Sequence, residues 1–249
     1  MTKPAPHNHI VTCLNCGNRY HGSFCNSCGQ DAHAGKIDRH FVYHELQHAL
    51  FHIDKGILYT LRTLFAAPGR TIKSFIEGHR VKHFKPLTFV IVIAGLYAFV
   101  NHFFNHTVIV SRHTGIQIAD NSVELVNEYL KEYFEWFILI QLPLIAWIYF
   151  AFFRKYGTNY IEQLVICAYV TGMRTLISTL LLPVSTYYPV VGYWAESLIP
   201  IILFCWTYLQ YYTGKPKAVI ITRVIMGYAS FYVLVLILLS VLLTLVASI

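Results

Sequence analysis

Five long apolar segments follow residue 86, and they constrain the fold of this chain more than any other feature. They cover about residues 87–104, 134–153, 161–182, 192–212 and 219–248. As helices rising about 1.5 Å per residue, such segments are long enough to cross about 30 Å of membrane hydrocarbon. Only 12% of the residues are charged, whereas about a quarter are charged in soluble domains. The sequence therefore predicts an all-α polytopic membrane protein, with about five transmembrane helices in residues 87–249.

The positions of Lys and Arg predict how these helices are oriented. Basic residues gather before the first apolar segment, in the second and fourth connections, and at the start of the fifth segment. These residues are Arg70, Lys73, Arg80, Lys82, Lys85, Arg154, Lys155, Lys215, Lys217 and Arg223. The opposite connections hold only Arg112 and Lys131. Since cytoplasmic flanks carry the excess of Lys and Arg, the N-terminus is expected in the cytoplasm and the C-terminus outside.

The same bias accounts for most of the net charge of +7, so nucleic acid is a less favoured partner than the lipid bilayer. The basic stretch before the first span is expected to contact anionic lipid head groups.

Two C-x-x-C-G turns lie close together near the N-terminus. Cys13 and Cys16 belong to the first, and Cys25 and Cys28 to the second. Because four thiolates from two tight turns can surround one Zn²⁺ ion, this spacing predicts a zinc ribbon over residues 13–32, after a flexible tail of residues 1–12. Two disulfides are the alternative. The tail lacks the apolar core of a signal peptide, so the ribbon is expected to stay in the reducing cytoplasm, which disfavours disulfides.

Residues 37–85 are predicted to form interfacial and juxtamembrane helices. Apolar residues recur at three- and four-residue steps as far as about Phe65, and the other face is polar, which is typical of an amphipathic helix at a membrane surface. That polar face carries a row of histidines one helical turn apart, which could bind a second metal ion or sense pH. The row is His40, His44, His48 and His52. A polar interfacial face is the simpler interpretation. His79 and His83 repeat the spacing before the first span.

Within this row, residues 44–48 also match the H-E-x-x-H pattern, in which two histidines bind zinc and the glutamate, here Glu45, activates water. The sequence identifies no third ligand. A zinc metalloprotease is therefore a lesser alternative, and no residue is assigned a catalytic role.

Two ionisable residues, Arg174 and Glu196, fall inside the predicted spans. Both are expected about 10 Å from the outer surface. Charges in hydrocarbon are costly unless they are paired or lie in a water-filled cavity. The two residues are therefore expected to pair, either in a pocket for a transported metal ion, lipid or small solute, or as a structural clamp between helices.

About the first third of the chain resembles an uncharacterised family of bacterial zinc-ribbon membrane proteins, described as a domain of unknown function. The resemblance is carried by the C-x-x-C-G-Q ribbon, an H-x-D-K-G-x-L-Y-T stretch, a P-G-x-T-I segment and a G-x-R before a proline. The matching positions are Cys13, Cys16, Cys25, Cys28, Gln30, His52, Asp54, Lys55, Gly56, Thr60, Pro68, Gly69, Gly78, Arg80 and Pro86. The resemblance implies an integral membrane protein of unassigned activity.

These features together predict a non-enzymatic protein of the bacterial inner membrane. Its cytoplasmic zinc ribbon is expected to recruit a protein partner or to assemble copies of the chain. A transporter or channel with a pocket near Arg174 and Glu196 is the alternative from a different functional class.

Overall fold

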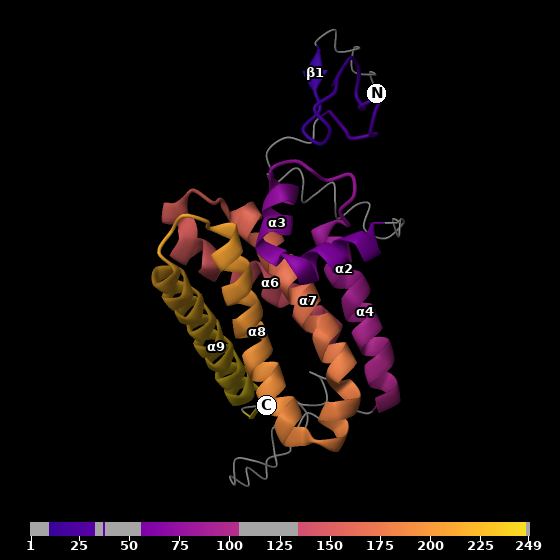
Figure 1. The fold of residues 1–249 in the computed structure, drawn as a ribbon. Helices are drawn as coiled ribbons and strands as arrows, with labels where there is room; N and C mark the ends of the chain where they lie inside the picture. Colours follow the sequence, from indigo (N-terminus) through magenta and orange to yellow (C-terminus); the bar gives the residue numbers. More distant parts are fainter. Residues whose placement is uncertain (1–9, 33–36, 38–55, 105–133, 248–249) are drawn as a thin grey trace.

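Five long helices run side by side in the computed structural model, which describes residues 10–32, 37, 56–104 and 134–247 (Figure 1). They are α4 (Pro86–Phe104), α6 (Phe134–Phe153), α7 (Tyr160–Tyr187), α8 (Pro189–Tyr211) and α9 (Lys217–Ala247). A short 3₁₀ turn, η1 (Arg154–Tyr156), follows α6. The structure therefore confirms that the protein is mostly helical.

Among the described residues, three segments are long and apolar enough to cross a membrane: Tyr160–Ser185, Val190–Tyr211 and Lys217–Leu238. The apolar segment Pro86–Asn101 of α4 is shorter. The count of about five spans predicted from the sequence therefore remains a prediction.

Helix α7 lies at the centre of the bundle, because it packs against α4, α6 and α8. Within its candidate span 72% of the residues are buried inside the protein, against 28% for α8 and for α9. A capping box fixes its start: the Asn159 side chain accepts a hydrogen bond from the Glu162 backbone N–H (2.8 Å), and the Glu162 carboxylate accepts one from the Asn159 N–H (2.9 Å). Helix α7 is therefore the central helix against which its long neighbours pack.

Two short helices, α2 (Ile57–Ala66) and α3 (Pro68–Ile76), lie across one end of the bundle (Figure 1). Helix α3 begins at Pro68, since proline is well tolerated at the first helical position. Leu64, Ile72 and Phe75 are buried in the same core as the long helices. The apolar faces of α2 and α3 therefore pack partly on the bundle. The start of the predicted interfacial helix, residues 38–55, lies outside the described residues.

The described part of the N-terminus forms a small module beyond the end of the bundle where α2 and α3 lie (Figure 1). Strands β1 (Val11–Thr12) and β2 (Arg19–Tyr20) pair antiparallel, with Val11 opposite Tyr20. Only Cys13, Tyr20 and Cys25 form its buried core. A module of this size needs a metal ion or cross-links to be stable. Its cysteines are the residues that could provide either.

A candidate metal centre and its attachment to the helical bundle

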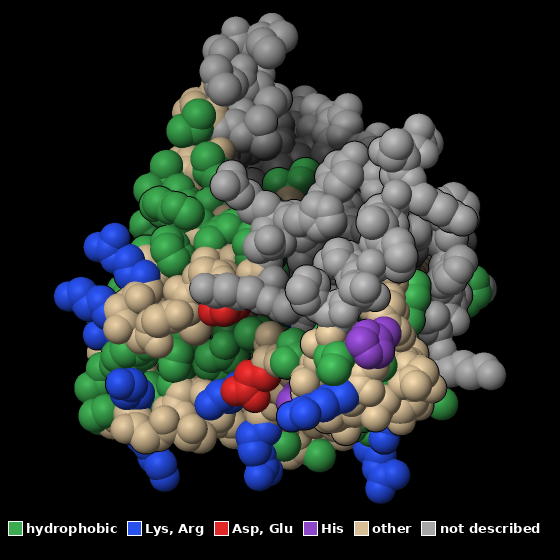
Figure 2. Space-filling view, turned by 90° about the horizontal axis from the view of Figure 1, so that it is seen from above, with side chains coloured by type: hydrophobic (Ala, Val, Ile, Leu, Met, Phe, Trp, Pro, Cys, Tyr) green, Lys and Arg blue, Asp and Glu red, His purple; other side chains and the backbone are tan. Residues whose placement is uncertain are grey.

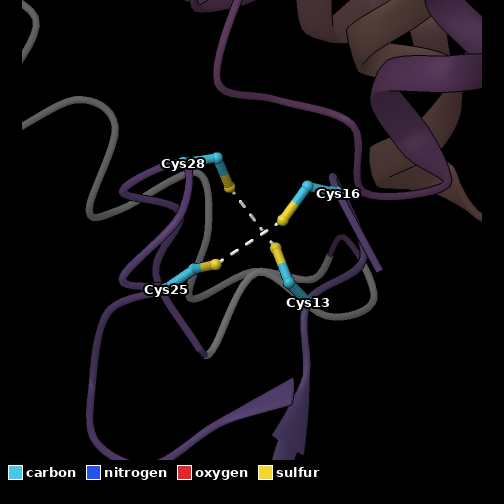
Figure 3. A group of neighbouring side chains, drawn as sticks. All are labelled: Cys13, Cys16, Cys25 and Cys28. Atoms are coloured by element: carbon cyan, nitrogen blue, oxygen red, sulfur yellow. Dashed lines mark hydrogen bonds between the residues drawn. The ribbon is translucent and has the colours of Figure 1, made fainter. Parts of the chain in front are cut away.

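Four cysteine side chains converge at one point in the N-terminal module. The Sγ atoms of Cys13, Cys16, Cys25 and Cys28 all lie within 4.8 Å of one another (Figure 3). The Cys13 and Cys28 sulfurs are 3.5 Å apart, and those of Cys16 and Cys25 are 3.6 Å apart. The structure thus brings together all four cysteines predicted from the spacing.

Two nearly identical turns hold these side chains. The Gly17 N–H donates to the Cys13 carbonyl at 2.9 Å, and the Gly29 N–H donates to the Cys25 carbonyl at 2.8 Å. Gly17 and Gly29 have φ angles of 74° and 76°, a left-handed conformation that glycine adopts at little cost. The two C-x-x-C-G sequences therefore fold into equivalent turns that present their sulfurs to a common centre.

The sulfur positions fit a tetrahedral metal ion. Zinc–thiolate bonds of about 2.3 Å place the sulfurs of a four-cysteine site about 3.8 Å apart, close to the separations of 3.5 and 3.6 Å in this cluster. All four cysteines are free, and a disulfide would need its sulfurs about 2.05 Å apart. Four thiolates would fill every position around the ion, so a site of this kind is structural and leaves no place for a substrate.

The backbone also prepares one thiol for metal binding. Burial raises the pKa of the Cys25 thiol, but the backbone N–H groups of Ser27 and Cys28 favour its thiolate, and the net result is a pKa lowered to about 6. Since a metal ion binds thiolates and not thiols, this lowered pKa favours coordination by Cys25 near neutral pH.

Gln30 attaches this module to the helical bundle. Its carbonyl accepts a hydrogen bond from the Cys25 N–H (2.8 Å), and its buried side chain accepts one from the Arg80 N–H (3.4 Å). Arg80 in turn donates through Nε to the Phe75 carbonyl (3.3 Å), and its guanidinium lies 5.5 Å from the centre of the Phe75 ring. The second cysteine turn is thereby linked to the end of α3.

A second attachment comes from Ile37, which is only 1% exposed and lies in the core of the bundle. Its carbonyl accepts a hydrogen bond from the Asn159 side chain at 3.4 Å. Ile37 is therefore held at the start of α7.

Residues 77–85, which we call the strap, connect α3 to α4 and are fixed on both sides. The Phe84 N–H donates to the Thr60 hydroxyl at 2.7 Å, and the Phe84 carbonyl accepts from the Tyr169 hydroxyl at 2.6 Å. The strap is thus tied to α2 and to the central helix α7.

His83 occupies an aromatic environment within the strap. Its ring centroid lies 5.3 Å from that of Tyr59 and 6.1 Å from that of Phe75. Burial lowers the pKa of His83, and the charge of nearby His79 lowers it further. The lowered pKa favours the neutral ring, which packs as an aromatic side chain.

The structure does not test the remaining site predictions. His40, His44, His48, His52 and Glu45 lie outside the described residues, so the second metal row and the H-E-x-x-H string remain predictions. Arg174 lies in α7 and Glu196 in α8, and their pairing also remains a prediction.

Sequence reasoning missed the positioning roles of Gln30 and Thr60, whose side chains accept hydrogen bonds from the Arg80 and Phe84 N–H groups. Both residues belong to the motifs that carry the family resemblance. A local motif does not show which distant residue each side chain contacts.

Comparison with known proteins adds one finding. Residues 54–98 match the model of a family described as "Protein of unknown function (DUF3667)". No curated protein and no solved structure matches the chain. The matched segment contains α2, α3, the strap and most of α4.

The match confirms the resemblance to a domain of unknown function in this part of the chain. Thr60, Gly69 and Arg80, three of the positions that carry the resemblance, make the contacts that hold α2, α3 and the strap in place.

Proposed function

We propose that the chain is a non-enzymatic protein of the bacterial inner membrane whose cytoplasmic zinc ribbon recruits a protein partner to the membrane surface. The observation that carries this proposal is the convergence of four thiols in a module that is held against the end of a bundle of apolar helices. A closed four-thiolate site organises a fold and offers no open coordination position for chemistry.

Zinc is the proposed occupant because the donor set is entirely thiolate and the separations suit tetrahedral coordination. The module has almost no hydrophobic core of its own. The free energy of metal binding would therefore supply most of its folding free energy.

The distribution of charge supports a cytoplasmic ribbon and five spans. Exposed Lys and Arg side chains project around the described margin of the molecule when it is viewed from the ribbon end (Figure 2). The exposed Lys and Arg residues of the described chain include Arg62, Arg70, Lys82, Arg154, Lys155, Lys215 and Lys217. Arg174 is the only described Lys or Arg in the other half of the bundle. This asymmetry agrees with the positive-inside rule, and the basic end would lie among anionic lipid head groups.

Two exposed apolar side chains make the ribbon suitable for binding a protein. Leu14, in the first cysteine turn, is 50% exposed, and Phe24, directly before the second, is 64% exposed. Exposed apolar side chains become buried when a partner covers them, and that burial stabilises the complex. The partner is proposed to be a cytoplasmic protein, with a second copy of this chain as the alternative.

The test uses the full chain in its native membrane, with a photo-crosslinking residue in place of Thr12, which is exposed on β1. A discrete cross-linked protein is expected in this background and should persist with Val81→Ala, an exposed apolar residue of the strap. It should be lost with Cys25→Ser and with the double variant Leu14→Ala, Phe24→Ala. The same cross-linked product in all four proteins would contradict recruitment by the ribbon.

A second candidate function is transport of a metal ion, a lipid or a small solute. The observation that favours it is the presence of Arg174 in α7 and Glu196 in α8, two ionisable residues within candidate membrane spans. Charged groups at membrane depth commonly mark a pathway or a binding site.

A further inference from the structure

Two connections at one end of the bundle carry a group of cations. The connection from α6 to α7 contains η1, and the connection from α8 to α9 covers residues 212–216; both lie at the end where α2 and α3 lie (Figure 1). Five cations belong to these connections or to the first two turns of α9. We call them the basic cluster: Arg154, Lys155, Lys215, Lys217 and Arg223. Four of them are exposed, and Arg223 is half-buried.

The ring of Tyr156, in η1, brings members of the cluster together. Its centroid lies 5.4 Å from that of Tyr212, at the start of the other connection. The Lys215 ammonium lies 5.3 Å from the centre of the Tyr156 ring, and the Arg223 guanidinium lies 4.5 Å from it. Both are cation–π distances. The other members of the cluster stand at most two residues along the chain from Tyr156 or from Lys215, so the five cations share one small area.

Two hydrogen bonds hold these groups in place. The Lys215 N–H donates to the Tyr212 carbonyl at 3.4 Å, and the Arg223 guanidinium donates to the Phe152 carbonyl at 3.1 Å. Cations held over one ring repel one another. An anion bound between them would relieve that repulsion and accept charge-assisted hydrogen bonds. The arrangement therefore favours a negatively charged ligand.

The basic cluster lies at the level of the lipid head groups. Three candidate membrane spans begin or end within a few residues of it: they begin at Tyr160 and Lys217, and the third ends at Tyr211. Residues just outside a span lie at the boundary between hydrocarbon and water, where the phosphates of phospholipids are found.

An apolar surface begins directly beside the cations. Val219 and Met226 lie about one helical turn before and after Arg223, and they are 39% and 52% exposed. Only 28% of the candidate span of α9 is buried inside the protein. A ligand that carries both a phosphate and acyl chains would match the cations and this apolar surface together.

We propose that the basic cluster binds one anionic phospholipid, with its phosphate at Lys215 and Arg223 and its acyl chains along α9. The planar guanidinium of Arg223 matches the geometry of a phosphate group. A zwitterionic lipid would bring a cation of its own, which the cluster repels. This inference uses the membrane placement proposed above but not recruitment by the ribbon, so this test and the cross-linking test can fail separately.

The experiment measures lipid binding to the full-length protein in neutral detergent by native mass spectrometry. The probes are dioleoyl-phosphatidylglycerol and dioleoyl-phosphatidylcholine, which share their acyl chains and phosphate and differ in net charge. Wild type is expected to bind one phosphatidylglycerol in preference to phosphatidylcholine. Arg223→Gln should weaken phosphatidylglycerol binding about fivefold, the usual effect of losing one basic residue at an anionic membrane surface. Undiminished binding in this variant would overturn the proposal.

A second variant covers the case in which Arg223→Gln does not fold. The double variant Lys155→Gln, Lys215→Gln changes two exposed side chains, one in each connection, and should weaken binding by about tenfold or more. Undiminished binding there would equally overturn the proposal.

The matched control is the double variant Arg62→Gln, Arg70→Gln. It removes two exposed arginines from α2 and α3 at the same end of the bundle. It should bind phosphatidylglycerol as wild type does. A loss equal to that of Lys155→Gln, Lys215→Gln would show that the general positive charge of this end attracts the lipid, and would overturn a site at the basic cluster.

Two further measurements test the geometry and the ligand. Tyr156→Leu keeps all five charges but removes the ring that lies between them, so it should bind phosphatidylglycerol several-fold more weakly. Undiminished binding would overturn a site built around that ring. In wild type, inorganic phosphate added at constant ionic strength should leave the lipid bound. Displacement of the lipid would identify a site for soluble phosphate and would overturn the lipid assignment.

Discussion

At the scale of the residue, buried hydroxyl groups in this protein fall into two kinds. Thr60 is fully buried, and its hydroxyl accepts the Phe84 N–H at 2.7 Å, which ties the strap to α2. Thr88, two residues into α4, is also buried, but its hydroxyl lacks a hydrogen-bond partner among the described residues. The two threonines therefore provide a matched pair in which only one hydroxyl contributes to stability.

Thr60→Val is expected to lower the free energy of unfolding by about 1–3 kcal/mol, because it leaves a buried backbone N–H without an acceptor. Thr88→Val should be neutral or slightly stabilising, since it removes a buried hydroxyl that loses its hydration on folding and gains no hydrogen bond from the described residues. Chemical denaturation in mixed micelles, followed by circular dichroism, measures both. Equal losses in the two variants would show that the Thr60 hydrogen bond does not hold the strap.

Some of these residues could be identified from the sequence, and others could not. The four cysteines were predictable because the local spacing of two tight turns is enough to define a metal site. The contact between Gln30 and Arg80 was not, because it joins residues 50 positions apart and no local pattern specifies it.

At the scale of the element, the short helices α2 and α3 differ from the rest of the fold because they lie across one end of the bundle. Helix α3 packs against α8, and Gly69 lies at this contact. A Cβ atom added there would lie 2.2 Å from the Thr207 carbonyl oxygen and 2.6 Å from the Tyr211 nitrogen. Both obstacles are backbone atoms of a helix, so the contact can be relieved only by moving α3.

Gly69→Ala is therefore expected to reduce stability by about 1–3 kcal/mol, the usual cost of overpacking. Gly95 is its control: it lies inside α4, and an added Cβ would meet no atom within 4 Å. Gly95→Ala should be neutral or stabilising by up to about 1 kcal/mol, since alanine is the better helix former. Thermal unfolding in detergent compares the two, and a stable Gly69→Ala protein would show that α3 is not docked on α8 as described.

The elements predicted best from the sequence are those with long apolar patterns. The ranges expected for the last three spans agree closely with α7, α8 and α9, since hydropathy alone defines such helices. The docking of α2 and α3 was not predictable, because an amphipathic sequence pattern is the same whether its apolar face packs against lipid or against protein. Tertiary packing decides between the two.

At the scale of the whole molecule, the ribbon and the bundle are mechanically connected. From Cys25 the connection runs through Gln30 to Arg80, and the strap that follows is fixed to Thr60 and Tyr169. The segment that matches the family of unknown function, residues 54–98, forms the receiving side of this connection. That segment therefore makes contacts that hold the four-cysteine module at the end of the helical bundle.

The measurement that tests this account most directly is the metal content per chain of tag-free, detergent-purified protein, determined by plasma mass spectrometry. Wild type is expected to contain about one zinc. Cys25→Ser should contain none, because three thiolates do not retain the ion against dialysis with a weak chelator. Cys205→Ser, which changes a free cysteine of α8 far along the chain from the cluster, should keep its zinc. Wild-type protein without zinc, or a full equivalent of zinc in Cys25→Ser, would contradict the central claim.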